Sequence, residues 1–101
     1  MPEYRIHIST EAEMDMVDLY NHIAYVYMAI STAHKYFEGI LDTIENLKIY
    51  GNSLAYSRHK SLIARYGNGV KVTHYKKMAI IFEIIDNVVY IYRVMAGALI
   101  Q

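Results

Sequence analysis

The last third of the chain, residues 70–94, constrains the fold most, because it predicts three consecutive antiparallel strands. β-branched and aromatic residues dominate both sides of Asp86-Asn87, a pair that tolerates positive φ and closes tight hairpins. Lys76-Lys77 is expected to form the other turn. These strands follow two segments with helical periodicity, so the order of elements is itself informative.

The first half predicts one strand and two helices. Apolar residues alternate with polar ones over residues 4–8, which indicates a strand with one buried face. Ser9 and Thr10 are competing N-cap residues, and Thr10 to Glu13 fits a capping box. Apolar residues then recur at helical spacing over residues 12–23 and again over residues 33–47. We therefore expect two amphipathic helices joined by a Tyr/Ala-rich connection.

The region between the second helix and the strands is expected to be irregular. Gly51-Asn-Ser53 ends the helix, and the basic stretch that follows runs to the turn at Gly67-Asn-Gly69. The order strand, helical hairpin and three-stranded meander predicts an α+β fold, with the first strand in the same sheet as the others. The helices are expected on one face of this sheet, and the other face is expected to be open.

Strand alternation assigns the side chains of the meander to these two faces. The helix-covered face is expected to carry Met78, Ile80, Phe82, Ile84, Val89 and Ile91. The open face is expected to carry Val72, His74, Ala79, Ile81, Glu83, Tyr90, Tyr92 and Val94. This second set mixes aromatic rings, a carboxylate and an imidazole, which is more typical of a partner-binding surface than of a core.

Composition indicates one domain over residues 1–101. The chain is 54% hydrophobic, enough for a core without covalent staples, and it has no cysteine for a disulfide, thiolate nucleophile or thiolate metal site. Neither a signal-peptide apolar region nor an apolar run of roughly 18 residues is present. We expect a soluble protein, and the cytoplasm is the compartment that the lack of cysteine fits best.

Charge is distributed unevenly although the formal net charge is zero. Residues 1–50 hold eight of the ten acids, and residues 51–101 hold seven of the ten bases. The bias has two interpretations: ordinary solvation of helices and strand edges, or a basic surface for a polyanion or an acidic partner protein. The residues expected to bind a protein partner or nucleic acid are Arg58, Arg65, Lys71, Tyr90, Tyr92 and Arg93.

Three stretches carry a family resemblance. Ile6-His-Ile-Ser-Thr-Glu-Ala12 followed by Asp15-Met-Val-Asp-Leu-Tyr-Asn-His-Ile23 resembles the start of RelE/ParE-type toxins of bacterial type II toxin–antitoxin modules, the plasmid stabilisation type. Residues 75–94, with Gly97 after them, are similar to the closing strands of that family. The resemblance implies a growth-inhibiting toxin without cofactor or metal. It also implies a cognate antitoxin whose C-terminal segment lies across the toxin surface.

Two departures from the family pattern bear on mechanism. Messenger-cleaving members usually present an arginine early in the third strand, where this chain has Ala79, and basic or His/Tyr residues after the last strand. Residues 95–101 contain no base, imidazole or phenol. His74 and Glu83 are left as the only acid/base candidates of the expected open face, and a surface His and Glu are commonly close by chance.

These departures favour the ParE branch, whose toxins act on DNA gyrase without chemistry of their own, so an enzymatic activity is not expected. The alternative is an endoribonuclease acting on ribosome-bound mRNA, with His74, Glu83, Lys71 or Arg93 in nonstandard roles. A third interpretation is a homologue without toxicity that serves as a binding module. A homodimer is compatible with each of them.

Overall fold

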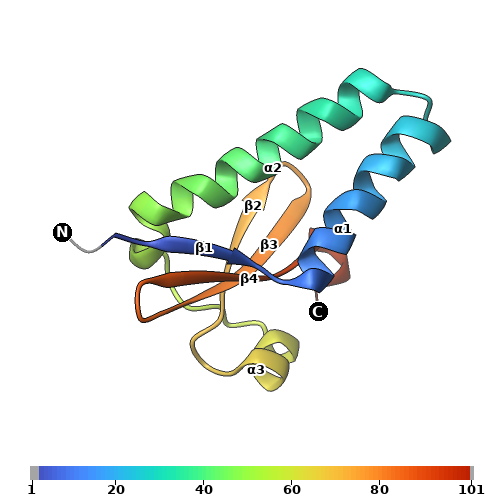
Figure 1. Ribbon diagram of the computed structural model, residues 1–101. Helices are drawn as coiled ribbons and strands as arrows, with labels where there is room; N and C mark the ends of the chain where they lie inside the picture. The colour runs from blue at the N-terminus through green and yellow to red at the C-terminus, as the bar shows by residue number, and fades with distance from the viewer. Residues whose placement is uncertain (1–2, 101) are drawn as a thin grey trace.

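The computed structural model describes residues 3–100, so Gln101 and the first two residues lie outside the description. It contains four strands, three α-helices, one π-helical turn and two short 3₁₀ turns (Figure 1). In chain order they are β1 (Arg5–Ile8), α1 (Thr10–Asn21), the π-helix His22–Val26, α2 (Ile30–Tyr50), a 3₁₀ turn (Gly51–Ser53), α3 (Lys60–Tyr66), β2 (Lys71–Tyr75), β3 (Met78–Ile85), β4 (Val88–Ala96) and a 3₁₀ turn (Gly97–Leu99). The expected α+β arrangement is confirmed. Among the helices described, none is both long and apolar enough to cross a membrane.

The strands form one mixed sheet in the order β1-β4-β3-β2. β1 pairs in parallel with β4, and the other two pairings are antiparallel hairpins. Both expected turns are present: Lys76 has a φ of 51°, and Asp86 and Asn87 have φ values of 50° and 65°. Positive φ at two successive residues matches the right-handed twist of the strands that this hairpin joins.

The main core lies between the helical hairpin and the sheet, where α1 and α2 cross the same face (Figure 1). Ile40, Ile44 and Leu47 of α2 pack there against Phe82 and Ile91. All five are fully buried or nearly so. The helix-covered face predicted from strand alternation is therefore confirmed for these strand residues.

Ser9, rather than Thr10, caps α1. The Ser9 hydroxyl accepts a hydrogen bond from the Ala12 N–H at 3.0 Å and donates one to the Tyr92 carbonyl at 2.9 Å. Thr10 is already helical, so the capping box predicted from Thr10 and Glu13 is wrong. A Ser9 hydroxyl bonded to β4 fixes the point at which the chain leaves β1 for the helix.

A β-bulge moves Val94 to the face opposite its predicted one. Ile81 pairs with Arg93 and Phe82 pairs with Ile91, so Tyr92 is the extra residue on β4. One extra residue reverses the alternation beyond it. Val94 consequently pairs with Ile80 and is buried in the core beneath the helices.

The second sheet face is only partly open, because α3 covers part of it, and the stretch between α2 and β2 is not wholly irregular. It contains α3, which buries Leu62 with Val70 and Ile81 in a second core cluster. Ala79, expected on an open surface, is fully buried. Seven residues make two helical turns, too few to display the periodicity that identifies a helix in a sequence.

Candidate functional site

The sheet face beneath α3 carries a hydrogen-bonded aromatic pair. The Tyr92 hydroxyl donates to Glu83 Oε1 at 2.9 Å, and the Tyr92 ring stacks on Tyr66 with centroids 4.7 Å apart and planes 7° apart. Burial, followed by the hydrogen bond to Glu83, raises the pKa of Tyr92 to about 12. Glu83 and Tyr92 are thus engaged with each other, and Tyr92 keeps its proton at neutral pH.

The structure does not bring His74 and Glu83 together. His74 pairs with Ala79 across the β2–β3 hairpin, four residues along β3 from Glu83. At about 3.3 Å per residue this separates the two positions by roughly 13 Å. His74 is exposed near Gly97, whereas Glu83 lies beside Gly69. Two groups at this spacing do not act as an acid/base pair on one ribose.

Arg93 is held by a carboxylate on α1. Its Nε and one terminal nitrogen donate to the two oxygens of Asp15 at 2.7 and 2.9 Å, and the Val94 N–H donates to Asp15 Oδ2 at 2.9 Å. Hydrogen bonding to Asp15 raises the pKa of Arg93, and burial opposes this rise. A second carboxylate, Glu11, lies 3.5 Å from the guanidinium. The positive charge of Arg93 is therefore largely neutralised within the chain.

Arg65 of α3 lies close to Arg93. Its terminal nitrogen is 3.8 Å from Glu11, and both partners are more than half exposed, so this ion pair is weak. A cavity of about 260 Å³ is lined by residues of α3, of the sheet and of the C-terminal end of the described chain. It is lined by Ser61, Leu62, Arg65, Tyr66, Ile81, Arg93, Met95, Leu99 and Ile100. Arg65 and Arg93 are the only bases of this lining.

Lys71 is buried, which corrects its expected role as a partner-binding residue. Only 4% of its surface is exposed, and its ammonium donates to the carbonyls of Gly51 and Asn52 at 3.2 and 3.1 Å. The ammonium also lies 5.1 Å from the centre of the Tyr56 ring. Burial lowers the pKa of Lys71. In this position it satisfies backbone carbonyls just beyond α2 and is not accessible to a partner.

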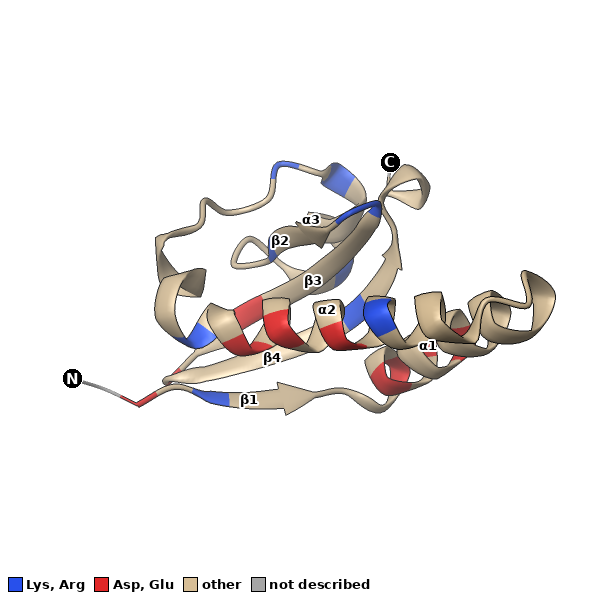
Figure 2. Ribbon diagram, turned by 90° about the horizontal axis from the view of Figure 1, so that it is seen from above, with Lys and Arg blue, Asp and Glu red and all other residues tan. Residues whose placement is uncertain are grey.

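The basic half of the chain nevertheless presents an exposed surface. Figure 2 shows acidic residues along α1 and α2, and most basic residues on the side of α3, β2 and β3. Arg58 is exposed in the loop before α3, and within residues 3–100 it forms no ion pair. Arg58 and Arg65 are thus the two basic candidates that remain available to a partner.

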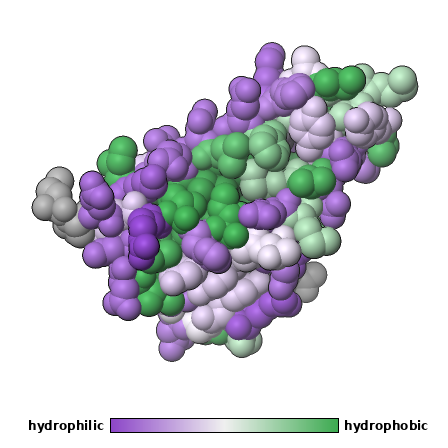
Figure 3. Space-filling view, in the orientation of Figure 1, coloured by the Kyte–Doolittle hydropathy of each residue, from purple (hydrophilic) through white to green (hydrophobic). Residues whose placement is uncertain are grey.

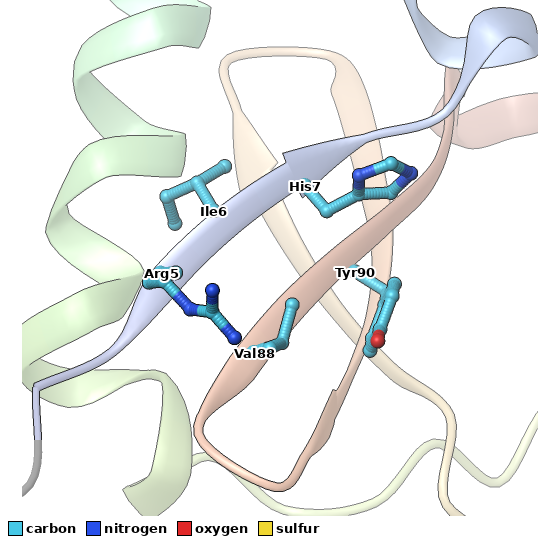
Figure 4. A pocket seen from close by; sticks show the side chains of 5 residues that line it. All are labelled: Arg5, Ile6, His7, Val88 and Tyr90. Atoms are coloured by element: carbon cyan, nitrogen blue, oxygen red, sulfur yellow. The ribbon is translucent and has the colours of Figure 1, made fainter.

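A further polar pocket, which the sequence analysis missed, lies where β1 pairs with β4. Figure 4 shows the rings of His7 and Tyr90 beside each other and the Arg5 side chain over Val88. The ring centroids of His7 and Tyr90 are 5.6 Å apart in an edge-to-face arrangement, and the pocket has a volume of about 250 Å³. The sequence predicts Tyr90 as a binding residue. The alternation of β1 gave a signal for Arg5 and His7, but only the parallel pairing places them next to Tyr90.

Most charged groups of the α3 side of the sheet are held by partners within the chain. The described residues contain no group of three His, Asp or Glu side chains that could hold a metal ion. On the α3 side of the sheet, Glu83 and Arg93 already have partners in the chain. The exposed groups around this part of the molecule include Arg58, Arg65 and His74, which suit binding of an acidic surface.

No protein-family model and no curated protein matches the sequence. Among solved structures, a chain of a chromosomal ParDE toxin–antitoxin system from P. aeruginosa is similar, with a TM-score of 0.75 and 17% identity, over 93% of this chain and 96% of that one. A chain of the toxin–antitoxin complex RelBE2 from Mycobacterium tuberculosis gives a TM-score of 0.66 and 15% identity, over 94% and 99%. The chain therefore shares the fold of these two chains over nearly its whole length, in agreement with the fold that the resemblance to RelE/ParE-type toxins predicts.

Proposed function

We propose that this protein is the toxin of a type II toxin–antitoxin module and that a cognate antitoxin neutralises it. The observation that carries the proposal is the near full-length likeness to chains of the ParDE and RelBE2 systems. It agrees with a resemblance drawn independently from residues 6–23 and 75–97. The exposed bases Arg58 and Arg65 suit an acidic segment of the antitoxin.

The target that fits best is DNA gyrase, inhibited by binding and without chemistry by the toxin. Cleavage of RNA needs a base for the 2′-hydroxyl, a cation for the phosphorane charge and an acid for the leaving oxygen. Here His74 and Glu83 lie roughly 13 Å apart, and Arg93 is held by Asp15. This geometry supports the gyrase interpretation, which itself comes from the resemblance to ParE.

Growth is the first test. The chain is expressed alone in bacteria from an inducible promoter, and then together with the product of the neighbouring reading frame. We expect slowed growth in the first strain and relief in the second. Growth equal to that of an empty vector, with soluble folded protein confirmed, would contradict the proposal and leave the binding-module interpretation.

A second experiment separates gyrase inhibition from RNA cleavage. Purified protein is expected to alter supercoiling by purified gyrase, and primer extension on transcripts from inhibited cells is expected to show no new ends. His74→Gln is the informative variant because His74 is exposed, whereas replacing Glu83 would also remove the partner of Tyr92. Codon-phased breaks that disappear in His74→Gln would overturn the gyrase mechanism in favour of a nuclease.

A further inference from the structure

The tip of the α1–α2 hairpin exposes a large apolar surface. Five large hydrophobic residues within residues 25–30 are more than half exposed: Tyr25 (70%), Val26 (64%), Tyr27 (68%), Met28 (86%) and Ile30 (56%). At about 100 Å² for each side chain this is roughly 500 Å², near the upper end for the largest apolar patch of a monomer. Patches of this size are often functional.

The backbone of the tip holds these side chains outward. The π-helix His22–Val26 ends α1, and Met28 follows with a φ of 52°, in the left-handed region that non-glycine residues seldom adopt. Ile23 and Ala24 turn inward, where they pack on Ala33 of α2, and Ala29 is partly buried against them. Met28 therefore combines an unfavourable backbone conformation with nearly complete exposure, although it contributes nothing to the core.

An apolar pocket lies beside the tip. It has a volume of about 320 Å³ and is lined by Val17, Tyr20, His34 and Phe37. The Tyr20 hydroxyl and His34 Nε2 are hydrogen-bonded at 3.0 Å, which fixes both rings as the pocket wall. Figure 3 shows hydrophobic residues gathered between α2 and β1 and continuing along the hairpin towards its tip. One hairpin thus carries both a projecting apolar group and a pocket.

The hairpin tip itself carries no Asp, Glu, Lys or Arg. No Asp, Glu, Lys or Arg occurs in residues 19–34, and the stretch is bounded by Asp18 on α1 and Lys35 on α2. Both flanking side chains are exposed, and in the described part of the chain neither forms an ion pair. An acid on one helix and a base on the other are complementary when two such hairpins meet about a twofold axis.

We propose that the hairpin tip docks with the tip of a second copy of this chain, in a twofold dimer that goes beyond the proposed toxin function. Tyr25 lies eight residues beyond Val17, about 12 Å along the helix, so overlapping antiparallel tips bring each projection to the partner copy's pocket. An isologous interface requires a surface that is complementary to itself. This hairpin meets that requirement because it carries a projection, a pocket and flanking charges of opposite sign. Two patches bury roughly 1,000 Å² in total, the lower end for a specific interface, so the dissociation constant is expected on the order of micromolar.

The test is sedimentation velocity of the full chain from about 1 to 100 µM. Wild type is expected to pass from monomer to dimer in this range. Met28→Asn removes the most exposed apolar side chain but suits the left-handed backbone, so the fold is retained and the dissociation constant rises at least about tenfold. The matched control is Ile49→Asn, since Ile49 is 85% exposed at the other end of α2, and it is expected to leave dimerisation unchanged.

Disulfide trapping gives a second readout because the chain has no cysteine. Tyr27→Cys is expected to form a covalent dimer under mild oxidation, and Ile49→Cys is not. A wild-type monomer at every concentration would overturn the proposal, as would a dimer that Met28→Asn leaves equally tight. A monomer that instead sediments with phosphatidylcholine vesicles through the tip would assign this surface to a lipid interface.

Discussion

Replacing Asp15 by asparagine tests the contact that joins α1 to the end of β4. Asp15 accepts two hydrogen bonds from Arg93 and one from the Val94 N–H, at 2.7 to 2.9 Å. Its side chain is 15% exposed and that of Arg93 is 30% exposed. Asparagine has nearly the same volume, so the substitution changes charge and hydrogen bonding and leaves the packing almost unaltered.

The cost follows from what asparagine cannot accept. One of its two terminal groups is an NH₂, so at most the carbonyl oxygen can still accept from Arg93 or Val94. Hydrogen bonds to charged groups contribute about 1.5–3 kcal/mol each. Water reaches the partly exposed Arg93 and replaces some of the loss. We therefore expect the free energy of unfolding to fall by about 2 kcal/mol, which lowers Tm by about 8–16 °C in a domain of this size.

Urea and thermal unfolding measure this difference, with Asp18→Asn as the matched control. Asp18 is exposed on the same helix and has no ion pair within the described residues, so its substitution is expected to cost less than about 0.5 kcal/mol. A double-mutant cycle with Arg93→Met is expected to give a coupling energy of about 1–2 kcal/mol. The reasoning is refuted if Asp15→Asn is as mild as Asp18→Asn or if the coupling is near zero.

Three other predictions address the remaining polar groups of the sheet and its surroundings. The free energy of unfolding is expected to fall as pH rises from 10 to 12, because the folded chain keeps the Tyr92 proton, with a pKa of about 12, that the unfolded chain loses near pH 10. Urea titrations at these two pH values measure this fall, and it should be smaller in Tyr92→Phe. Lys71→Glu places an acid among backbone carbonyls and is expected to destabilise the fold by about 3 kcal/mol or more in chemical unfolding. Arg58→Glu is expected to slow antitoxin association, most strongly at low salt, and Lys48→Glu on α2 is expected to leave the rate unchanged, as measured by stopped-flow mixing. Equal association rates for the two variants would show that the excess of bases in residues 51–101 serves ordinary surface solvation and not partner binding.

Local signals account for the parts of the fold that the sequence predicted. The turn at Asp86-Asn87 needs two residues that accept positive φ, and the residue types Asp and Asn predict it. The helix-covered strand faces follow from alternation on either side of that turn. Such features depend on neighbours within a few positions of the sequence, so they can be predicted before any tertiary contact is known.

Long-range contacts explain what the sequence could not predict. The bulge at Tyr92 exists only through the pairing of β3 with β4, and it reverses the facing of Val94. Asp15 and Arg93 are 78 positions apart, and no periodicity relates them. A lysine at the start of a strand usually indicates a solvated edge, but the carbonyls of Gly51 and Asn52 draw Lys71 inward.

The same contacts bear on how the protein acts. RNA cleavage needs an acid, a base and a cation that are close enough to converge on one phosphate. In this chain the carboxylate of Glu83 accepts from Tyr92, Arg93 is neutralised by Asp15, and Lys71 is buried against carbonyls. Arg5 and Arg58 remain exposed at separate places. Glu83, Arg93 and Lys71 are used to hold the fold together, so the exposed cations are the groups left for contact with an acidic partner, as the proposed function expects.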